Sequence, residues 1–260
     1  MSKLNTSISN FFNKEKSKST VKAYQEIHNN PDYDDGIRYI VIDEPSDGWI
    51  NALSSSGIIS LCEYTKIQLL RKSNGRVHFK ILDGHIMPGH EAIITEYEAA
   101  KYMKRATRHK GIHIVVENTN NREKYYSSVR EKEFIQHIGI IQYNNIATKC
   151  SLVTEGHQNI KSLPPGEYNI LAPSQPYSST KTENYRIDSE KGQFERVWFS
   201  IDNAQSGRHL HMGHVSRGSL TVLDINAWES LYKELIRNRI DGNDTSEVGG
   251  GKYIGKITLK

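Results

Sequence analysis

The stretch Arg208-His209-Leu210-His211-Met212-Gly213-His214-Val215-Ser216-Arg217-Gly218-Ser219-Leu220-Thr221-Val222 decides how this 260-residue sequence is interpreted. Within it, three histidines, two arginines and two serines lie in a short run that glycine interrupts and that ends in an apolar sequence. Apolar β-branched residues favour strands, and glycine favours turns. The pattern therefore predicts a loop between two strands that carries a concentration of polar side chains.

Ser219 is the candidate nucleophile of this stretch. A hydroxyl or thiol acts as a nucleophile when a base lies within hydrogen-bond reach, and a loop that folds back would bring His211 or His214 to Ser219. Gly218 lets the backbone approach a substrate carbonyl closely, so the N–H groups of Gly218 and Ser219 are candidates for an oxyanion hole. These residues indicate nucleophilic acyl chemistry, although their spacing alone does not identify the reaction.

Three motifs in this half of the chain resemble those of the L,D-transpeptidase family. Ser216-Arg217-Gly218-Ser219-Leu220 resembles the signature in which Ser, then His or Arg, then Gly precede the catalytic Cys and an aliphatic residue. His211-Met212-Gly213, which follows Arg208, resembles the motif whose histidine activates that Cys. Leu163-Pro164-Pro165-Gly166-Glu167-Tyr168-Asn169-Ile170 resembles the hairpin that opens the substrate-facing half of these domains. Ser219 stands where the family has its nucleophilic cysteine.

The resemblance covers roughly residues 135 to 260 and implies a mostly β catalytic domain, a mixed sandwich-like fold with one packed helix. It implies an enzyme that attacks a peptidoglycan stem peptide between meso-diaminopimelate and D-alanine and forms an acyl-enzyme on residue 219. Water would resolve this intermediate by carboxypeptidase action, and an amine would give crosslinking or D-amino-acid exchange. The resemblance implies no cofactor.

The resemblance also implies roles for single residues. His211 would be the base that activates Ser219, and Gly218 would belong to the oxyanion site. The gap between His211 and Ser219 is shorter than in many family members, so the other two histidines stay open as alternative bases. The residues that would bind substrate are Ser216, Arg217, Arg208, His214 and His209. Either arginine would meet a substrate carboxylate through a bidentate pair.

A serine at position 219 predicts a weakly active or inactive chain. Imidazole readily forms a thiolate, whereas an alcohol loses its proton only during attack, so serine is the poorer nucleophile. Two explanations fit the residue. Ser219 replaces a catalytic cysteine by engineering, or the chain is a natural variant that binds peptidoglycan or a protein without turning it over.

Composition limits the partners and the compartment. The net charge of +4 comes from 34 basic and 30 acidic residues, which does not imply nucleic acid. Cys62 and Cys150 form no disulfide framework, and no apolar run is long enough to span a bilayer.

The polar start, Met1 to Lys18, predicts synthesis in the cytoplasm without a signal peptide. A cell-wall substrate would then require export to the periplasm or cell wall. This suggests an antibacterial effector with a secretion-system carrier and an immunity protein.

Metal binding is the less favoured interpretation of the histidines. His209, His211 and His214 lack a nearby Cys or an HExxH pattern, so we predict no zinc site. The pair His85 and His90 flanks a Pro-Gly sequence, which indicates a turn.

The fold class predicted for the whole chain is α+β, with a division between residues 133 and 134. Residues 1–133 are predicted to form an α+β domain of unknown role with a polar N-terminal arm, and residues 134–260 the catalytic domain.

β-branched runs predict strands at 37–42, 66–70, 77–82, 112–116, 138–143, 148–153, 167–171, 196–201, 219–223 and 253–259. Helices are predicted at 91–105 and 121–134, and an amphipathic helix at 227–239 is capped by Asn226. A fragment that starts near Phe134 is expected to fold alone.

Overall fold

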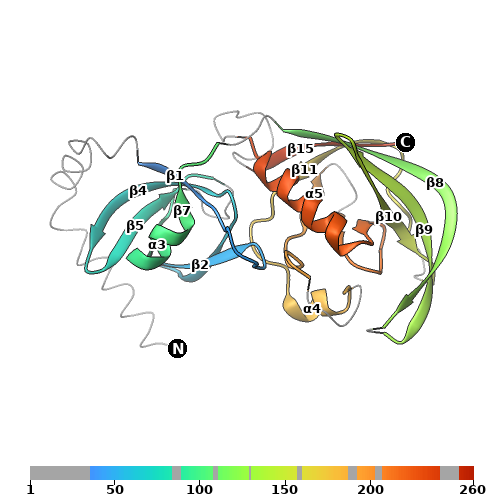
Figure 1. Ribbon diagram of the computed structural model, residues 1–260, viewed down its shortest axis with the longest axis horizontal. Helices are drawn as coiled ribbons and strands as arrows, with labels where there is room; N and C mark the ends of the chain where they lie inside the picture. The colour runs from blue at the N-terminus through green and yellow to red at the C-terminus, as the bar shows by residue number, and fades with distance from the viewer. Residues whose placement is uncertain are drawn as a thin grey trace. The chain divides into compact units, whose positions relative to one another are not determined.

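The computed structural model describes residues 36–83, 89–107, 111–128, 130–156, 160–186, 192–202, 207–240 and 252–260. In these ranges the protein is mostly β, with one seven-stranded sheet and one closed barrel (Figure 1). The chain divides into two compact units, residues 1–44 with 49–107 and residues 45–48 with 108–260. No helix in the described ranges is both long and apolar enough to cross a membrane. The predicted N-terminal arm and most of the predicted turn between His85 and His90 lie outside the described residues.

The first unit is an antiparallel sheet with the strand order β3-β2-β6-β5-β4-β1-β7. Its strands are β1 (Ile37–Ile40), β2 (Trp49–Ser54), β3 (Gly57–Cys62), β4 (Lys66–Ser73), β5 (Arg76–Ile81), β6 (Glu91–Thr95) and β7 (Met103–Lys104). Alternate residues of these strands point to one face, where side chains such as Ile40, Ile67 and Phe79 are buried in one apolar cluster. This cluster gives the unit a hydrophobic core of its own.

The segment Glu91 to Arg105 is not the single helix that its composition predicts. Its first part is β6, which pairs with β5 and β2, because Ala92, Ile93 and Ile94 form an apolar run that is buried in the sheet. Helix α3 (Glu96–Tyr102) begins only after Thr95. The Thr95 hydroxyl accepts a hydrogen bond from the Glu98 N–H, and the Glu98 carboxylate accepts one from the Thr95 N–H, which is a capping box.

The second unit is a closed barrel with the strand order β10-β14-β13-β12-β11-β15-β8-β9. Its strands are β8 (Ile112–Ser127), β9 (Lys132–Tyr143), β10 (Ile146–Thr154), β11 (Gly166–Leu171), β12 (Phe199–Asp202), β13 (His209–Met212), β14 (Leu220–Val222) and β15 (Tyr253–Leu259). The pairs β13–β14 and β15–β8 are parallel, and the others are antiparallel. The mostly β character of this half is confirmed, but the sheet closes into a barrel where a sandwich-like arrangement was expected.

Strand β8 explains why the division of the chain lies earlier than the predicted boundary between residues 133 and 134. The polar composition of residues 121–134 predicts a helix, yet β8 runs through Ser127 and pairs along its length with β9. A register shift between Asn118 and Asn121 leaves Asn120 with a positive φ of 58°. The other edge of β8 pairs with β15, so the barrel needs this strand to close.

Helix α5 (Ile225–Arg237) is the amphipathic helix that the sequence predicts, with a different cap. Asp224, and not Asn226, is the N-cap, and its carboxylate accepts a hydrogen bond of 2.7 Å from the Ala227 N–H. The helix, labelled in Figure 1, contacts β13 and β14. Its buried face consists of Trp228, Leu231, Tyr232, Leu235 and Ile236. It therefore packs behind the two strands that carry the predicted site residues. The only other helix described in this unit is the short α4 (Ser179–Glu183).

A fragment of residues 108–260 is expected to fold, whereas a fragment of residues 134–260 is not. The longer fragment keeps all eight barrel strands, while the shorter one lacks β8 and exposes the edges of β9 and β15. Circular dichroism should show a cooperative thermal transition for the longer fragment only. A cooperative transition of the shorter fragment would mean that β8 is dispensable and that the predicted boundary is right.

Candidate functional site

Two short neighbouring strands bring the predicted site residues together. β13 runs parallel to β14, with His211 opposite Thr221. Ser219 directly precedes β14, and its hydroxyl accepts a hydrogen bond of 3.2 Å from the His209 backbone N–H. Residues that lie opposite each other in a sheet project from the same face. One face of β13 therefore carries His209 and His211, and the Thr221 hydroxyl lies opposite His211 on the same face.

The environment of His209 suits a proton acceptor for residue 219. The imidazole is half-buried, and it hydrogen-bonds the backbone carbonyl of Gly207. Burial lowers the pKa of His209, and the bond to the Gly207 carbonyl partly offsets this effect. A carbonyl that holds one ring N–H leaves the other ring nitrogen as an acceptor. Ser219 itself is only 6% exposed.

His211 lies deeper and is hydrogen-bonded at both ring nitrogens. Its Nδ1 lies 2.8 Å from the Met212 carbonyl, which assigns the proton to Nδ1, and its Nε2 lies 3.3 Å from the Thr221 hydroxyl. Burial lowers the pKa of His211 to about 3. His211 is therefore neutral at neutral pH. Among the described residues, no hydrogen bond joins the Ser219 hydroxyl to either imidazole.

An aromatic cluster covers the two histidines. The Trp198 indole stacks on the His211 imidazole with a centroid distance of 3.7 Å, and on the Tyr177 ring at 3.8 Å. Tyr185 meets His211 edge-on at 5.5 Å. His209 meets Trp198 edge-on at 5.6 Å. Such contacts fix ring orientations and exclude water, which accounts for the low pKa of the buried imidazole.

His214, which was predicted to bind substrate, lies apart from Ser219. Its side chain is fully buried, and its Nε2 is 2.7 Å from the Ser127 hydroxyl of β8. The ring stacks near Tyr125 and contacts Phe134. Burial, together with the positive charge of Arg130, lowers its pKa to about 4. This placement gives His214 a structural role between the loop and β8.

The loop from Gly213 to Ser219 is buried, and side chains of β9 and β10 satisfy its backbone. Gln136 donates a hydrogen bond of 2.6 Å to the His214 carbonyl. Thr154 exchanges two hydrogen bonds with the Ser216 backbone, at 2.7 and 2.9 Å. The Ser216 hydroxyl donates to the Ser219 carbonyl at 2.7 Å. A buried backbone needs such partners, so the Ser216 hydroxyl, which was predicted to bind substrate, here binds the backbone of Ser219.

The Arg208 guanidinium also holds this loop. It donates hydrogen bonds to the backbone carbonyls of Arg217 and of Lys161, the latter at 3.1 Å. Gly218 fits beneath it with a φ of +80°, a conformation that favours glycine. A Cβ at Gly218 would lie 2.3 Å from the Lys161 carbonyl oxygen and 2.5 Å from an Arg208 nitrogen. Arg208 is thus engaged by the backbone, while the neighbouring Arg217 is exposed.

We expect Gly218→Ala to destabilise the barrel unit more than Gly156→Ala. Gly156 also has a positive φ, of 91°, but a Cβ there meets nothing within 4 Å. Gly156→Ala is therefore expected to lower the free energy of unfolding by about 1–2 kcal/mol, which is the cost of placing a side chain in the left-handed conformation. In Gly218→Ala the new methyl group also clashes with the Lys161 carbonyl, which should lower the free energy of unfolding by about 1–3 kcal/mol more. Urea titrations of both variants measure the difference. Equal losses would mean that the loop relaxes around the new methyl group.

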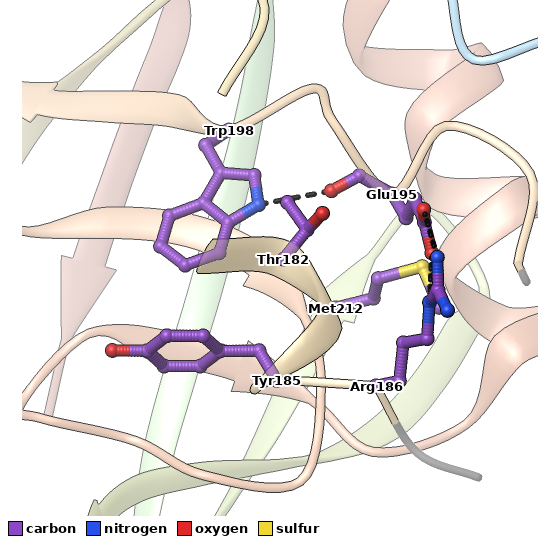
Figure 2. Close-up of a pocket in the computed structure, with 6 residues that line it drawn as sticks. All are labelled: Thr182, Tyr185, Arg186, Glu195, Trp198 and Met212. Atoms are coloured by element: carbon purple, nitrogen blue, oxygen red, sulfur yellow. Dashed lines mark hydrogen bonds and ion pairs between the residues drawn. The ribbon is translucent and has the colours of Figure 1, made fainter. Parts of the chain in front are cut away.

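A small pocket adjoins the buried side of the aromatic cluster (Figure 2). It is lined by Thr182, Tyr185, Arg186, Glu195, Trp198 and Met212. Arg186 binds the buried Glu195 carboxylate through two hydrogen bonds of 3.0 Å, and this bond raises the arginine pKa. The Trp198 indole N–H donates to the Glu195 carbonyl at 3.0 Å. The ion pair and this bond anchor the indole that stacks on His211.

Sequence reasoning missed the aromatic part of the site. Tyr177, Tyr185 and Trp198 come from the segment between β11 and β12, where no motif marks them. Only the concentration of aromatic residues in an otherwise polar segment hinted at a contact surface. The oxyanion role of Gly218 and Ser219 stays a prediction.

No group of three or more His, Cys, Asp or Glu side chains in the described ranges could hold a metal ion. No family model, no curated protein and no solved structure matches this chain. Evidence on the function therefore comes from the geometry of the strand pair β13–β14 and from the motif resemblance.

Proposed function

We propose that this chain is a peptidoglycan-modifying enzyme of the L,D-transpeptidase type whose acyl-enzyme forms at position 219. With Ser219 in place of Cys, it binds stem peptides and turns them over poorly. The observation that carries the proposal is the parallel pair β13–β14, which brings the strand of His209 and His211 beside Ser219, whose hydroxyl accepts a hydrogen bond from the His209 backbone N–H. The motif resemblance supplies the substrate class.

The proposed reaction begins with attack on the carbonyl of the bond between diaminopimelate and D-alanine. The nucleophile at 219 gives up its proton to an imidazole, and the tetrahedral intermediate expels D-alanine as the imidazole returns the proton. The acyl group then passes to water or to an amine. Arg208 and Ser216 keep the loop in place for this step, because both bind the backbone around residue 219.

A non-catalytic module that binds peptidoglycan or a protein is the second candidate. The observation that favours it is the state of the Ser219 hydroxyl, which accepts a hydrogen bond from a backbone N–H and is hydrogen-bonded to no imidazole in the described part of the chain. Such a module would keep the shape of the site without its reactivity.

The test compares Ser219→Cys with the unchanged chain on tetrapeptide-bearing muropeptides, with D-alanine release or exchange followed by mass spectrometry. Processing by the Cys form supports the enzyme. A folded Cys form that binds muropeptides but never processes them supports the binding module.

A further inference from the structure

A short segment from the first part of the chain belongs to the barrel unit. Pro45–Gly48 lies in the sequence between strands β1 and β2 of the first unit, yet its contacts place it in the second. The Phe194 N–H donates a hydrogen bond of 3.2 Å to the Ser46 carbonyl. The Asp47 carboxylate forms an ion pair of 3.1 Å with Arg196. The unit that carries the candidate site therefore includes residues that the sequence places between two strands of the other unit.

Gly48 lets this segment pack closely. Its φ is +85°, and a Cβ there would lie 2.7 Å from a Val197 methyl carbon and 2.9 Å from the Tyr232 hydroxyl oxygen. Phe194, which binds the Ser46 carbonyl, stacks on Tyr232 with a centroid distance of 3.8 Å. Phe194 has a φ of 58°, a left-handed conformation that a bulky residue keeps only when its surroundings hold it. The segment is therefore part of the packing of the barrel unit.

Arg196 links this segment to the aromatic cluster. Its Nε donates a hydrogen bond of 3.0 Å to the Tyr177 carbonyl, and the Tyr177 N–H donates one of 2.9 Å to the Arg196 carbonyl. Asp47 binds the same guanidinium at its NH1 nitrogen. A guanidinium is a rigid planar group, so a carboxylate that holds one of its nitrogens also orients the others. The Tyr177 ring stacks on Trp198, and Trp198 stacks on His211.

The Asp47–Arg196 pair is partly shielded from solvent. Its side chains are 25% and 29% exposed. The ion pair between Asp43 and Lys104 in the first unit is more open, with side chains 66% and 41% exposed. Solvent and salt weaken an exposed pair more than a shielded one. Asp43→Asn therefore serves as a control that removes a neighbouring aspartate ion pair without touching the aromatic cluster.

We propose that Asp47 is a positioning residue of the candidate site, which acts through Arg196 to hold the Tyr177–Trp198 stack on the histidines. The His209 ring contacts Tyr177 and Trp198 edge-on, at 5.9 and 5.6 Å, so the restraint also reaches the imidazole whose backbone binds Ser219. The expected effect on muropeptides rests on the proposed function, whereas the position of the aromatic rings is independent of it.

The test measures ring positions and ligand binding in the full chain. An imidazole stacked on an indole has its C–H proton signals shifted upfield by the ring current of the indole. We expect Asp47→Asn to move the His211 C–H signals downfield, and Arg196→Gln to move them at least as far. In the Arg196→Gln chain, Asp47→Asn should add no further movement, because the carboxylate acts through the arginine. Asp43→Asn should leave the signals in place.

The same variants are compared by calorimetry with a tetrapeptide-bearing muropeptide. Asp47→Asn should weaken binding about fivefold, which is the upper range for one ion pair, and Asp43→Asn should not. If Asp47→Asn leaves the His211 signals in place while the unchanged chain binds the muropeptide, the positioning role is wrong and the proposed function stands. Moved signals with an unchanged affinity would also overturn that role. If Asp47→Asn moves the signals but no form binds the muropeptide, Asp47 does position the aromatic rings and the peptidoglycan function fails.

Discussion

Ser219→Cys is expected to raise the rate of D-alanine release from tetrapeptide muropeptides by several orders of magnitude. A cysteine thiol has a pKa of about 8.5, and a neighbouring imidazole lowers it further, so a large fraction is thiolate near neutral pH. A serine hydroxyl is not ionised there and must lose its proton during attack. The backbone of the loop is held by Gln136, Thr154 and Arg208, so the change replaces one attacking atom in a fixed setting.

Ser219→Ala is the matched control, and it should match the unchanged chain if the serine is inert. The two native cysteines do not confuse the result. Cys62 and Cys150 are buried, and burial raises the pKa of the Cys150 thiol to about 12. A carbapenem, which acylates the cysteine of L,D-transpeptidases, should therefore add its mass to the Ser219→Cys form alone. A folded Cys form that neither releases D-alanine nor gains this mass would rule out the enzyme.

Local sequence patterns predicted the elements that depend on local physics. The amphipathic period of Trp228, Leu231 and Leu235 marked α5, because one helix face must be apolar to pack on a sheet. Strands such as β15 were marked by β-branched runs between polar residues. The C-terminal part of β8 was not predicted, because its residues are polar and show no strand pattern. This part is a strand because it hydrogen-bonds with β9, and sequence patterns do not reveal that pairing.

The sequence pointed to the polar residues of the candidate site but not to the residues that pack against them. Spacing along the chain pointed to His211 and Ser219 but could not show that Thr221 lies opposite His211. That register follows from a parallel pairing, which is a tertiary feature. Likewise Arg208 was interpreted as a substrate ligand, because its use by the carbonyls of Arg217 and Lys161 is visible only after folding. Trp198 lies in the strand predicted at 196–201, but no motif marked it as part of the site, and it reaches His211 only across the strand pair β12–β13.

In the Ser219→Cys chain, His209→Gln is expected to reduce D-alanine release about a hundredfold or more, and His211→Gln much less. The motif resemblance implied His211 as the base, whereas the environments of the two imidazoles favour His209. Burial lowers the pKa of His211 to about 3, although its hydrogen bond to the Met212 carbonyl acts to raise it, and so low a pKa opposes the imidazolium that a thiolate needs as partner. His209 is half-buried, its backbone N–H hydrogen-bonds the Ser219 hydroxyl, and one of its ring nitrogens is held by the Gly207 carbonyl.

The pH dependence of thiol alkylation in the Ser219→Cys chain separates a base from a merely structural histidine. Iodoacetamide reacts with the thiolate, so the midpoint of its rate profile reports the thiol pKa whether or not muropeptides are processed. With His209 present, the midpoint should lie below about 8.5, and His209→Gln should move it back to that value or above. His211→Gln should leave the midpoint in place, even if loss of stacking on Trp198 lowers the melting temperature. If His211→Gln moves the midpoint and His209→Gln does not, the assignment from the motif resemblance is the right one, and the Thr221 hydroxyl must release the His211 Nε2 when a thiol stands at 219.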